Sequence, residues 1–222
     1  MRSGAASSSR RAPPRLSWGV HRIPPPGAGR DPVVMDIVLV DDHPAVRAGL
    51  RGLIEDEDGL RVAATAATAR EGFEAIADTR PQVALVDLHL PDDDGLSLCL
   101  RTRSLPAPPR VIIYSAFADS GLAVRGVIAG AEGVLPKATA PRLLLDALRD
   151  GAGARLDGRA LRALGERLDE ADLPILGMLA HGVGPREIAA TLGLEPEWLE
   201  ARRWAMLSRL GPAARRRPLA AA

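Results

Sequence analysis

Cysteine, lysine and aromatic residues are all scarce in this chain of 222 residues. Its one cysteine, Cys99, excludes an internal disulfide bond, and no CxxC motif or Cys/His cluster is present. No stretch approaches the run of about 18 apolar residues that a membrane-spanning helix needs. The four histidines are scattered, without the spacing of metal ligands. These absences favour a reducing compartment, and we expect a cytoplasmic protein with no membrane partner.

Charge is distributed unevenly along the chain. All lysine and arginine residues of the chain are arginine except one, Lys137. The position of this single lysine therefore needs an explanation. Residues 35–150 carry 12 basic and 18 acidic residues, a net charge of −6, whereas residues 1–34 have a net charge of +5 and residues 168–222 of 0. An acidic segment is a poor general nucleic-acid binder, so any such role is expected outside residues 35–150.

Three segments, residues 1–34, 151–167 and 212–222, are predicted to be disordered or connecting. Residues 1–34 are rich in Ser, Pro, Gly, Ala and Arg and lack a hydrophobic period, which predicts a disordered extension. Their composition superficially resembles that of an organellar transit peptide, but Met35 directly precedes the first predicted strand and is favoured as the true start. We expect residues 151–167 to form a linker and residues 212–222 to form a disordered Arg/Ala tail.

Residues 35–150 alternate five times between short apolar runs and helix-like stretches. Such alternation is typical of a parallel sheet covered on both faces, because buried parallel strands are apolar along their whole length. We therefore predict a five-stranded, doubly wound, flavodoxin-like α/β domain. The expected strands are 37–40, 60–64, 83–86, 111–114 and 134–135, and the expected helices are 44–56, 69–78, 94–103, 120–130 and 140–150.

Polar residues follow four of the five predicted strands. Asp41 and Asp42 follow the first strand, Asp87 the third, Ser115 the fourth and Lys137 the fifth. Sites in such sheets lie at the carboxyl ends of the strands. Converging carboxylates suit Mg²⁺, and a carboxylate with a free oxygen can attack a phosphoryl group, which a lysine and a hydroxyl would then bind. Each residue also has an ordinary interpretation, such as a helix cap or a chance lysine, but their coincidence at strand ends favours a phosphoryl-accepting site.

The strings that carry these residues resemble the receiver domain of response regulators. They are IVLVDDHPAVRAGL (37–50), ALVDLHLPDDDGL (84–96), VIIYSA (111–116) and GVLPKA (133–138). The resemblance implies that Asp87 is the phosphoacceptor. It also implies that Ser115 and Lys137 form the phosphate switch, and that Mg²⁺ is bound by Asp41, Asp42, Asp87 and the backbone carbonyl of His89.

Two features of this segment qualify the resemblance. The family usually has an aromatic residue shortly before the lysine, where this chain has Val134 and Leu135, so transmission of the signal is expected to use other contacts. Asp92, Asp93 and Asp94 are interpreted as a solvated turn and helix start rather than as metal ligands. No second aspartate stands two residues after Asp87, so we expect a phospho-accepting regulator with at most slow self-dephosphorylation, not an enzyme.

Residues 168–211 predict a small all-α domain. Helices are expected at 169–180, 185–192 and 195–210, with a turn at Gly193 that is typical of a helix-turn-helix motif. The segment resembles the LuxR/NarL-type output domain, and this resemblance makes 195–210 the recognition helix for the major groove. The expected core consists of Leu173, Leu176, Leu179, Ile188, Leu192, Leu199, Met206, Leu207 and Leu210.

The recognition helix departs from the family in its charge. Glu195, Glu197 and Glu200 place three carboxylates where DNA phosphates would lie. The candidate DNA-binding residues are Arg186, Trp198, Arg202, Arg203 and Arg209. Arg203 falls within the apolar stripe, so it must reach outward to solvent or weaken the packing. One of the two tryptophans of this helix, Trp198 or Trp204, is expected in the core.

Two functions follow from this reading. In the first, the protein is a two-component response regulator that accepts a phosphoryl group from a histidine kinase and binds DNA as a homodimer through its helix-turn-helix domain. In the second, the output domain is degenerate and acts through protein–protein contacts, as the acidic recognition helix suggests.

Overall fold

The computed structural model describes residues 34–151, 162–163 and 166–211. The predicted extension at residues 1–34, except Val34, most of the linker at 151–167 and the tail at 212–222 lie outside the described residues. Among the described residues, no helix is both long and apolar enough to cross a membrane.

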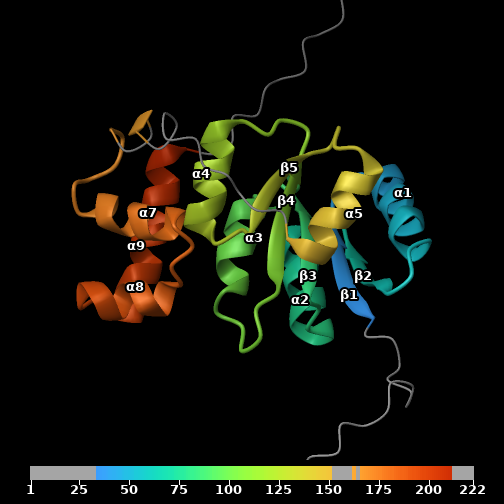
Figure 1. The fold of residues 1–222 in the computed structure, drawn as a ribbon, viewed down its shortest axis with the longest axis horizontal. Helices are drawn as coiled ribbons and strands as arrows, with labels where there is room; N and C mark the ends of the chain where they lie inside the picture. Colours follow the sequence, from blue (N-terminus) through green and yellow to red (C-terminus); the bar gives the residue numbers. More distant parts are fainter. Residues whose placement is uncertain (1–33, 152–161, 164–165, 212–222) are drawn as a thin grey trace, which may run out of the picture. The chain divides into compact units, whose positions relative to one another are not determined.

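A five-stranded parallel sheet with the order β2-β1-β3-β4-β5 forms the centre of the first part of the chain (Figure 1). The predicted doubly wound α/β fold is confirmed. Near-continuous burial of the inner strands explains why their sequences are apolar on both faces. The strands are β1 (Met35–Val40), β2 (Leu60–Ala66), β3 (Val83–Asp87), β4 (Arg110–Ser115) and β5 (Gly133–Pro136).

Five helices cover the two faces of the sheet. α1 (Pro44–Glu55) and α5 (Pro141–Asp150) pack on one face, and α2 (Ala69–Thr79), α3 (Gly95–Thr102) and α4 (Ser120–Ala129) pack on the other (Figure 1). Side-chain caps define the starts of three helices. Thr68, Asp94 and Asp119 accept hydrogen bonds from backbone N–H groups of the first turns of α2, α3 and α4.

Arg110 fastens the amino end of β4 to its surroundings. Its guanidinium donates to the backbone oxygen of Leu148 on α5 at 2.5 Å and to the carboxylate of Glu132 before β5 at 3.2 Å. Its side chain is only about one-third exposed, which strengthens these charge-assisted hydrogen bonds relative to those in open solvent. The amino end of β4, which lies opposite Ser115, is therefore joined to α5 and to the residue before β5.

The second part of the described chain is helical: α7 (Asp172–Ala180), α8 (Pro185–Leu192) and α9 (Pro196–Leu210). α8 is capped by Gly193, whose φ of +64° is a left-handed conformation that glycine adopts without strain, and α9 begins three residues after this glycine. The predicted helix-turn-helix is confirmed. Its apolar residues form one buried cluster that also contains Val124 and Ile128 of α4.

Several expectations for this helical part are wrong in detail. α7 begins at Asp172 rather than at 169. Leu173 is 44% exposed, because the buried face of α7 is formed by Asp172, Ile175, Leu176 and Leu179, and Leu173 lies about a quarter turn away from it. Leu192, the last residue of α8, is also exposed. Neither tryptophan of α9 is fully buried: Trp198 is exposed and Trp204 is half-buried.

Candidate phosphoryl-accepting site

Two buried carboxylates lie side by side at the carboxyl edge of the sheet. Asp41 directly follows β1 and Asp87 ends β3, and these strands pair in parallel with Val40 opposite Val86. Only 3% of Asp41 and 4% of Asp87 is exposed. The short apolar strands thus bring two acidic groups that are 46 residues apart in sequence into one crevice.

Lys137 bridges the two carboxylates. Its Nζ lies 2.6 Å from Oδ2 of Asp41 and 2.8 Å from Oδ2 of Asp87. It reaches them from the loop after β5, where its backbone N–H donates to the carbonyl of Ser115. The only lysine of the chain is therefore the cation that compensates the buried acidic pair.

The pKa values in the crevice follow from burial and from this pairing. Burial raises the pKa of Asp87, and the negative charge of Asp41 adds to the rise, while the hydrogen bond from Lys137 opposes it. Burial alone would lower the pKa of Lys137, but its hydrogen bonds to Asp41 and Asp87 outweigh that effect and leave the pKa raised. The site therefore holds a charged lysine beside Asp87, whose ionised form is disfavoured by burial.

Ser115 ends β4, next to β3, and is fully buried. Its Oγ accepts a hydrogen bond from the backbone N–H of Phe117 at 3.2 Å. The structure thus places this predicted switch residue at the same edge of the sheet as Asp87 and Lys137, and its hydroxyl holds the loop that leads to α4. Phe117 itself is 62% exposed, an unusual position for a large aromatic side chain.

The structure brings Asp42 and, unexpectedly, His43 into the same acidic cluster. Ligand atoms of Asp41, Asp42, His43 and Asp87 lie within 4.8 Å of one another. His89, whose backbone carbonyl is a predicted metal ligand, stands two residues after Asp87, and its backbone N–H points to Asp87 Oδ1 at 3.4 Å. Oxygen donors on three neighbouring carboxylates fit a hard divalent cation.

Sequence reasoning missed three contributors to this region. Asp92 accepts hydrogen bonds from the backbone N–H groups of Ala69 and Arg70 at 2.7 and 3.0 Å, and so ties the loop after β3 to the start of α2. Tyr114, paired with β5, donates its hydroxyl to the carbonyl of Lys137 at 3.0 Å. Gly95 approaches so closely that an added Cβ would lie 2.2 Å from the carbonyl oxygen of Asp87.

The signal for these contributors was weak in the sequence. Asp92 stands in a run of three aspartates, and only its contacts distinguish it from Asp93. Tyr114 is the only tyrosine of the chain, and it reaches the loop of Lys137 from β4. β5 has no aromatic residue before Lys137, so this hydroxyl provides another contact between that loop and the sheet.

The candidate DNA-binding arginines of α9 have partners within the chain. Arg202 pairs through Nε with Asp172 and through Nη2 with Asp169 at 2.6 Å. Arg209 Nη1 lies 2.6 Å from Asp169 and 3.2 Å from Asp172. Asp172 is fully buried, so its two arginine partners supply the compensation that a buried carboxylate requires.

Arg203 does not reach solvent as expected. Its side chain is 0% exposed, and its Nε donates to the carbonyl of Ile128 on α4 at 2.8 Å. Both terminal nitrogens are buried without a hydrogen-bond partner among the described residues, and burial lowers the pKa of the guanidinium. Of the five candidates, Arg186 and Trp198 remain exposed, and Arg186 forms no ion pair with the part of the chain that the structure describes. Trp198 lies beside the Arg202 guanidinium.

Comparison with known proteins identifies the family of the chain. The family model of the response regulator receiver domain matches residues 37–149. The transcriptional regulatory protein UhpA of Salmonella typhimurium is 32% identical over 184 residues, which cover 80% of this chain and 92% of UhpA. DevR/DosR of Mycobacterium tuberculosis, described as a DNA-binding transcriptional activator, is 30% identical over 193 residues, which cover 80% of this chain and 89% of DevR/DosR.

A solved structure gives the same result. The crystal structure of a LuxR-family response regulator from Aurantimonas sp. SI85-9A1 superposes with a TM-score of 0.52 at 33% identity, covering 61% of this chain and 99% of that one. The residues that the receiver-domain model matches, 37–149, include Asp41, Asp87 and Lys137. The chain belongs to the response regulators of two-component systems and is of the LuxR/NarL type.

Proposed function

We propose that this response regulator accepts a phosphoryl group on Asp87 from a histidine kinase in the cytoplasm. The observation that carries the proposal is Lys137, whose Nζ lies within 2.8 Å of both Asp41 and Asp87 in a buried crevice. A carboxylate oxygen of Asp87 attacks phosphorus, the phosphorus–nitrogen bond of the phosphohistidine breaks, and the imidazole leaves. Lys137 then pairs with the new phosphoryl oxygens.

The carboxylates of Asp41, Asp42 and Asp87, with the carbonyl of His89, are the groups that would hold Mg²⁺. The cation would neutralise charge on the transferring phosphoryl group. Ser115 would donate its hydroxyl to a phosphoryl oxygen after giving up the hydrogen bond that this hydroxyl donates to the backbone carbonyl of Phe117 at 3.3 Å. That exchange would free the carbonyl of Phe117 and so allow the loop before α4 to change its conformation.

Phosphorylation by a small-molecule donor tests the acceptor. Wild-type protein incubated with acetyl phosphate and Mg²⁺ should gain one phosphoryl group, seen by intact-mass measurement or by a mobility shift in a phosphate-binding gel. Asp87→Asn should gain none. Asp93→Asn, which removes an exposed carboxylate of the neighbouring loop, is the matched control and should behave as wild type. Undiminished phosphorylation of Asp87→Asn would remove Asp87 as the acceptor.

His89 stands two residues after Asp87, where a phosphohydrolase would have a second aspartate. We therefore expect no enzymatic turnover beyond slow self-dephosphorylation. A lifetime measurement of the phosphorylated protein, after removal of the donor, checks this: loss within seconds would contradict it.

The proposed output is DNA binding by a phosphorylated homodimer through a separate domain, residues 168–211. The relative DevR/DosR is described as DNA-binding, and α8–α9 has the helix-turn-helix geometry. α9 also contacts α4 through Arg203, and Arg203 and the apolar cluster would have to leave α4 before this face of α9 could meet DNA. Phosphorylation is expected to favour that release and to raise the dimer fraction in light scattering.

DNA binding is tested with the full chain, with and without acetyl phosphate, at low and high salt. Phosphorylated protein should bind duplex DNA in a salt-dependent manner, and Asp87→Asn should not respond to the donor. The second candidate is an output domain that binds protein. It is favoured by the ion pairs that occupy Arg202 and Arg209, and by the exposed Trp198 next to Glu197. Absence of DNA binding by phosphorylated protein at low salt would select it.

A further inference from the structure

His43 lies beside the acidic cluster and is not needed for the helix that it precedes. It is the N-cap residue of α1, but its side chain makes no capping hydrogen bond. Its imidazole Nδ1 instead lies 2.5 Å from Oδ1 of Asp42 and 3.3 Å from Oδ1 of Asp41. The side chain is 65% exposed, so it is free to adjust its position.

The backbone helps to hold His43 in this place. Its N–H donates to Oδ1 of Asp41 at 2.8 Å. Because Pro44 follows and opens α1, the backbone of His43 is restricted to an extended conformation, with φ −87° and ψ 110°. The backbone of His43 is therefore held in place, whereas its imidazole ring is largely exposed.

Oxygens of the buried carboxylates are divided between two partners. Lys137 occupies Oδ2 of Asp41 and Oδ2 of Asp87. Oδ1 of Asp41 is next to His43, and Oδ1 of Asp87 is next to the backbone N–H of His89. A cation that bound on the Oδ1 side would therefore meet an imidazole nitrogen as well as carboxylate oxygens, without displacing the lysine from Oδ2.

We propose that His43 supplies a nitrogen ligand to the acidic cluster, which makes it a mixed site that binds a borderline divalent cation such as Ni²⁺, Cu²⁺ or Zn²⁺ more tightly than Mg²⁺. The donors are one imidazole nitrogen and carboxylate oxygens of Asp41, Asp42 and Asp87, all within 4.8 Å of one another. Imidazole favours these metals over Mg²⁺, whose ligands are oxygens. Ligand atoms around one cation are about 3–4 Å apart at bond lengths near 2.1 Å, so His43 and Asp42 need to separate by a few tenths of an ångström.

The proposal rests on the proposed phosphoryl-accepting site, because it concerns a cation held by the same carboxylates. A cation bound through His43 would compete with Mg²⁺ for Asp41, Asp42 and Asp87. It would thereby make phosphorylation of Asp87 sensitive to transition metals, with His43 as the residue that confers the sensitivity.

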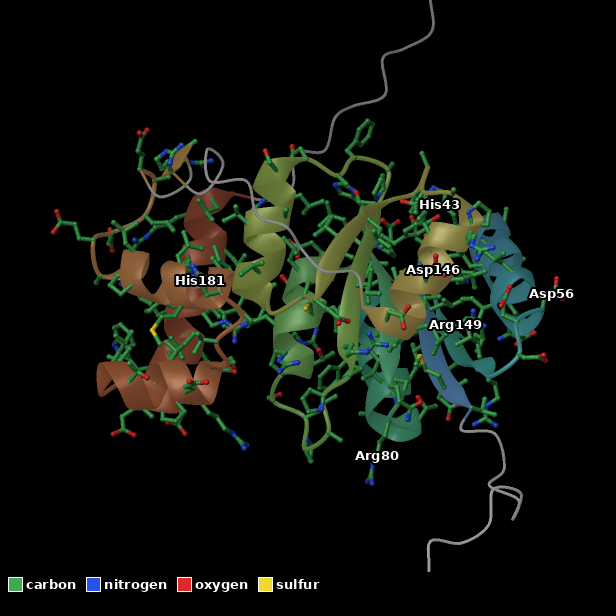
Figure 2. All side chains as sticks on the ribbon, in the orientation of Figure 1. His43, Asp56, Arg80, Asp146, Arg149 and His181 are labelled. Atoms are coloured by element: carbon green, nitrogen blue, oxygen red, sulfur yellow. The ribbon has the colours of Figure 1, made fainter. Side chains whose placement is uncertain are left out.

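The test compares metal affinities of the full chain without an affinity tag. Calorimetric titration with NiCl₂ and separately with MgCl₂ is applied to wild type, His43→Gln and His181→Gln. His181 is the matched control: it is exposed and its Nδ1 contacts the carbonyl of Gly177 on α7 (Figure 2). His43→Gln should weaken Ni²⁺ binding by about tenfold or more and leave the Mg²⁺ affinity within about twofold. His181→Gln should change neither affinity.

A spectroscopic readout identifies the ligand directly. Electron paramagnetic resonance of one equivalent of Cu²⁺ should show coupling to an imidazole nitrogen in wild type, and His43→Gln should lose it. Equal Ni²⁺ affinity and unchanged Cu²⁺ spectra in wild type and His43→Gln would overturn the proposal, as would a loss of Ni²⁺ binding in His181→Gln.

Failure of the two proposals can be told apart. If Asp87 is phosphorylated in Mg²⁺ but His43→Gln binds Ni²⁺ like wild type, only the role of His43 is wrong. If wild type binds neither Mg²⁺ nor Ni²⁺ and Asp87 is not phosphorylated, the phosphoryl-accepting site itself is wrong.

Discussion

Replacing Asp87 by asparagine should stabilise the fold at neutral pH in the absence of divalent cations. Burial raises the pKa of Asp87 above its value in the unfolded chain, despite the hydrogen bond from Lys137. A raised pKa in the folded state means that its stabilising contribution is complete below the unfolded pKa and is lost as the pH rises through the folded pKa. Each unit of difference corresponds to about 1.4 kcal/mol. Asparagine keeps the shape and removes the charge, so we expect a gain of about 1 kcal/mol at pH 7.

Urea unfolding in EDTA, followed by circular dichroism, measures the effect. With a slope of about 2 kcal/mol per molar urea, a gain of this size raises the midpoint by about 0.5 M. The difference between the proteins should shrink near pH 4, where Asp87 is increasingly protonated. Asp146→Asn is the control, because Asp146 is exposed on α5 (Figure 2), and it should change stability by less than about 0.5 kcal/mol.

The stability of Asp87→Asn at pH 7 shows in which direction the pKa of Asp87 is shifted. If Asp87→Asn is less stable than wild type at pH 7 without cations, pairing with Lys137 outweighs burial and the pKa of Asp87 is lowered, not raised. The same high concentration of Mg²⁺ should stabilise wild type more than Asp87→Asn, because a ligand that binds the folded state more tightly stabilises it more.

Three further changes have expected outcomes. Lys137→Met leaves two buried carboxylates without a cation, so urea unfolding should show a loss of about 2 kcal/mol or more at pH 7 and a smaller loss in acid. Gly95→Ala should cost about 2 kcal/mol, because its Cβ meets the carbonyl of Asp87, whereas Gly52→Ala, with open space around its Cβ, should be neutral or stabilising in the same assay. Asp172→Ala removes one of the two carboxylates that pair with Arg202 and Arg209, and it should destabilise α7–α9 by about 1–2 kcal/mol in urea unfolding followed by tryptophan fluorescence. An unchanged midpoint would show that the ion pairs of Asp172 do not stabilise the fold.

The sheet and the residues at its carboxyl edge could be predicted from the sequence because both depend on local patterns. Apolar runs of four to six residues define parallel strands, and the residue after each strand lies at a known edge. Asp41, Asp87, Ser115 and Lys137 needed only that rule to be placed together, and the structure places them there.

Contacts between elements could not be predicted in the same way. Periodicity marks the apolar face of α9, but nothing local shows that Asp169 and Asp172 approach Arg202 and Arg209, or that Arg203 packs against α4. Those pairings depend on how one helix lies across another. His43 was passed over for a related reason: the four histidines have no ligand spacing, and only the fold brings this one against Asp41 and Asp42.

Anchoring of β4 by Arg110 has a mechanical consequence for signalling. The strand is only six residues long, and the Arg110 side chain ties its first residue to the backbone oxygen of Leu148 and the carboxylate of Glu132. Movement of the strand along its axis, driven from Ser115 at its carboxyl end, is opposed by these contacts of Arg110. A displacement is therefore expected just beyond the strand, in the segment that carries Phe117 and leads into α4.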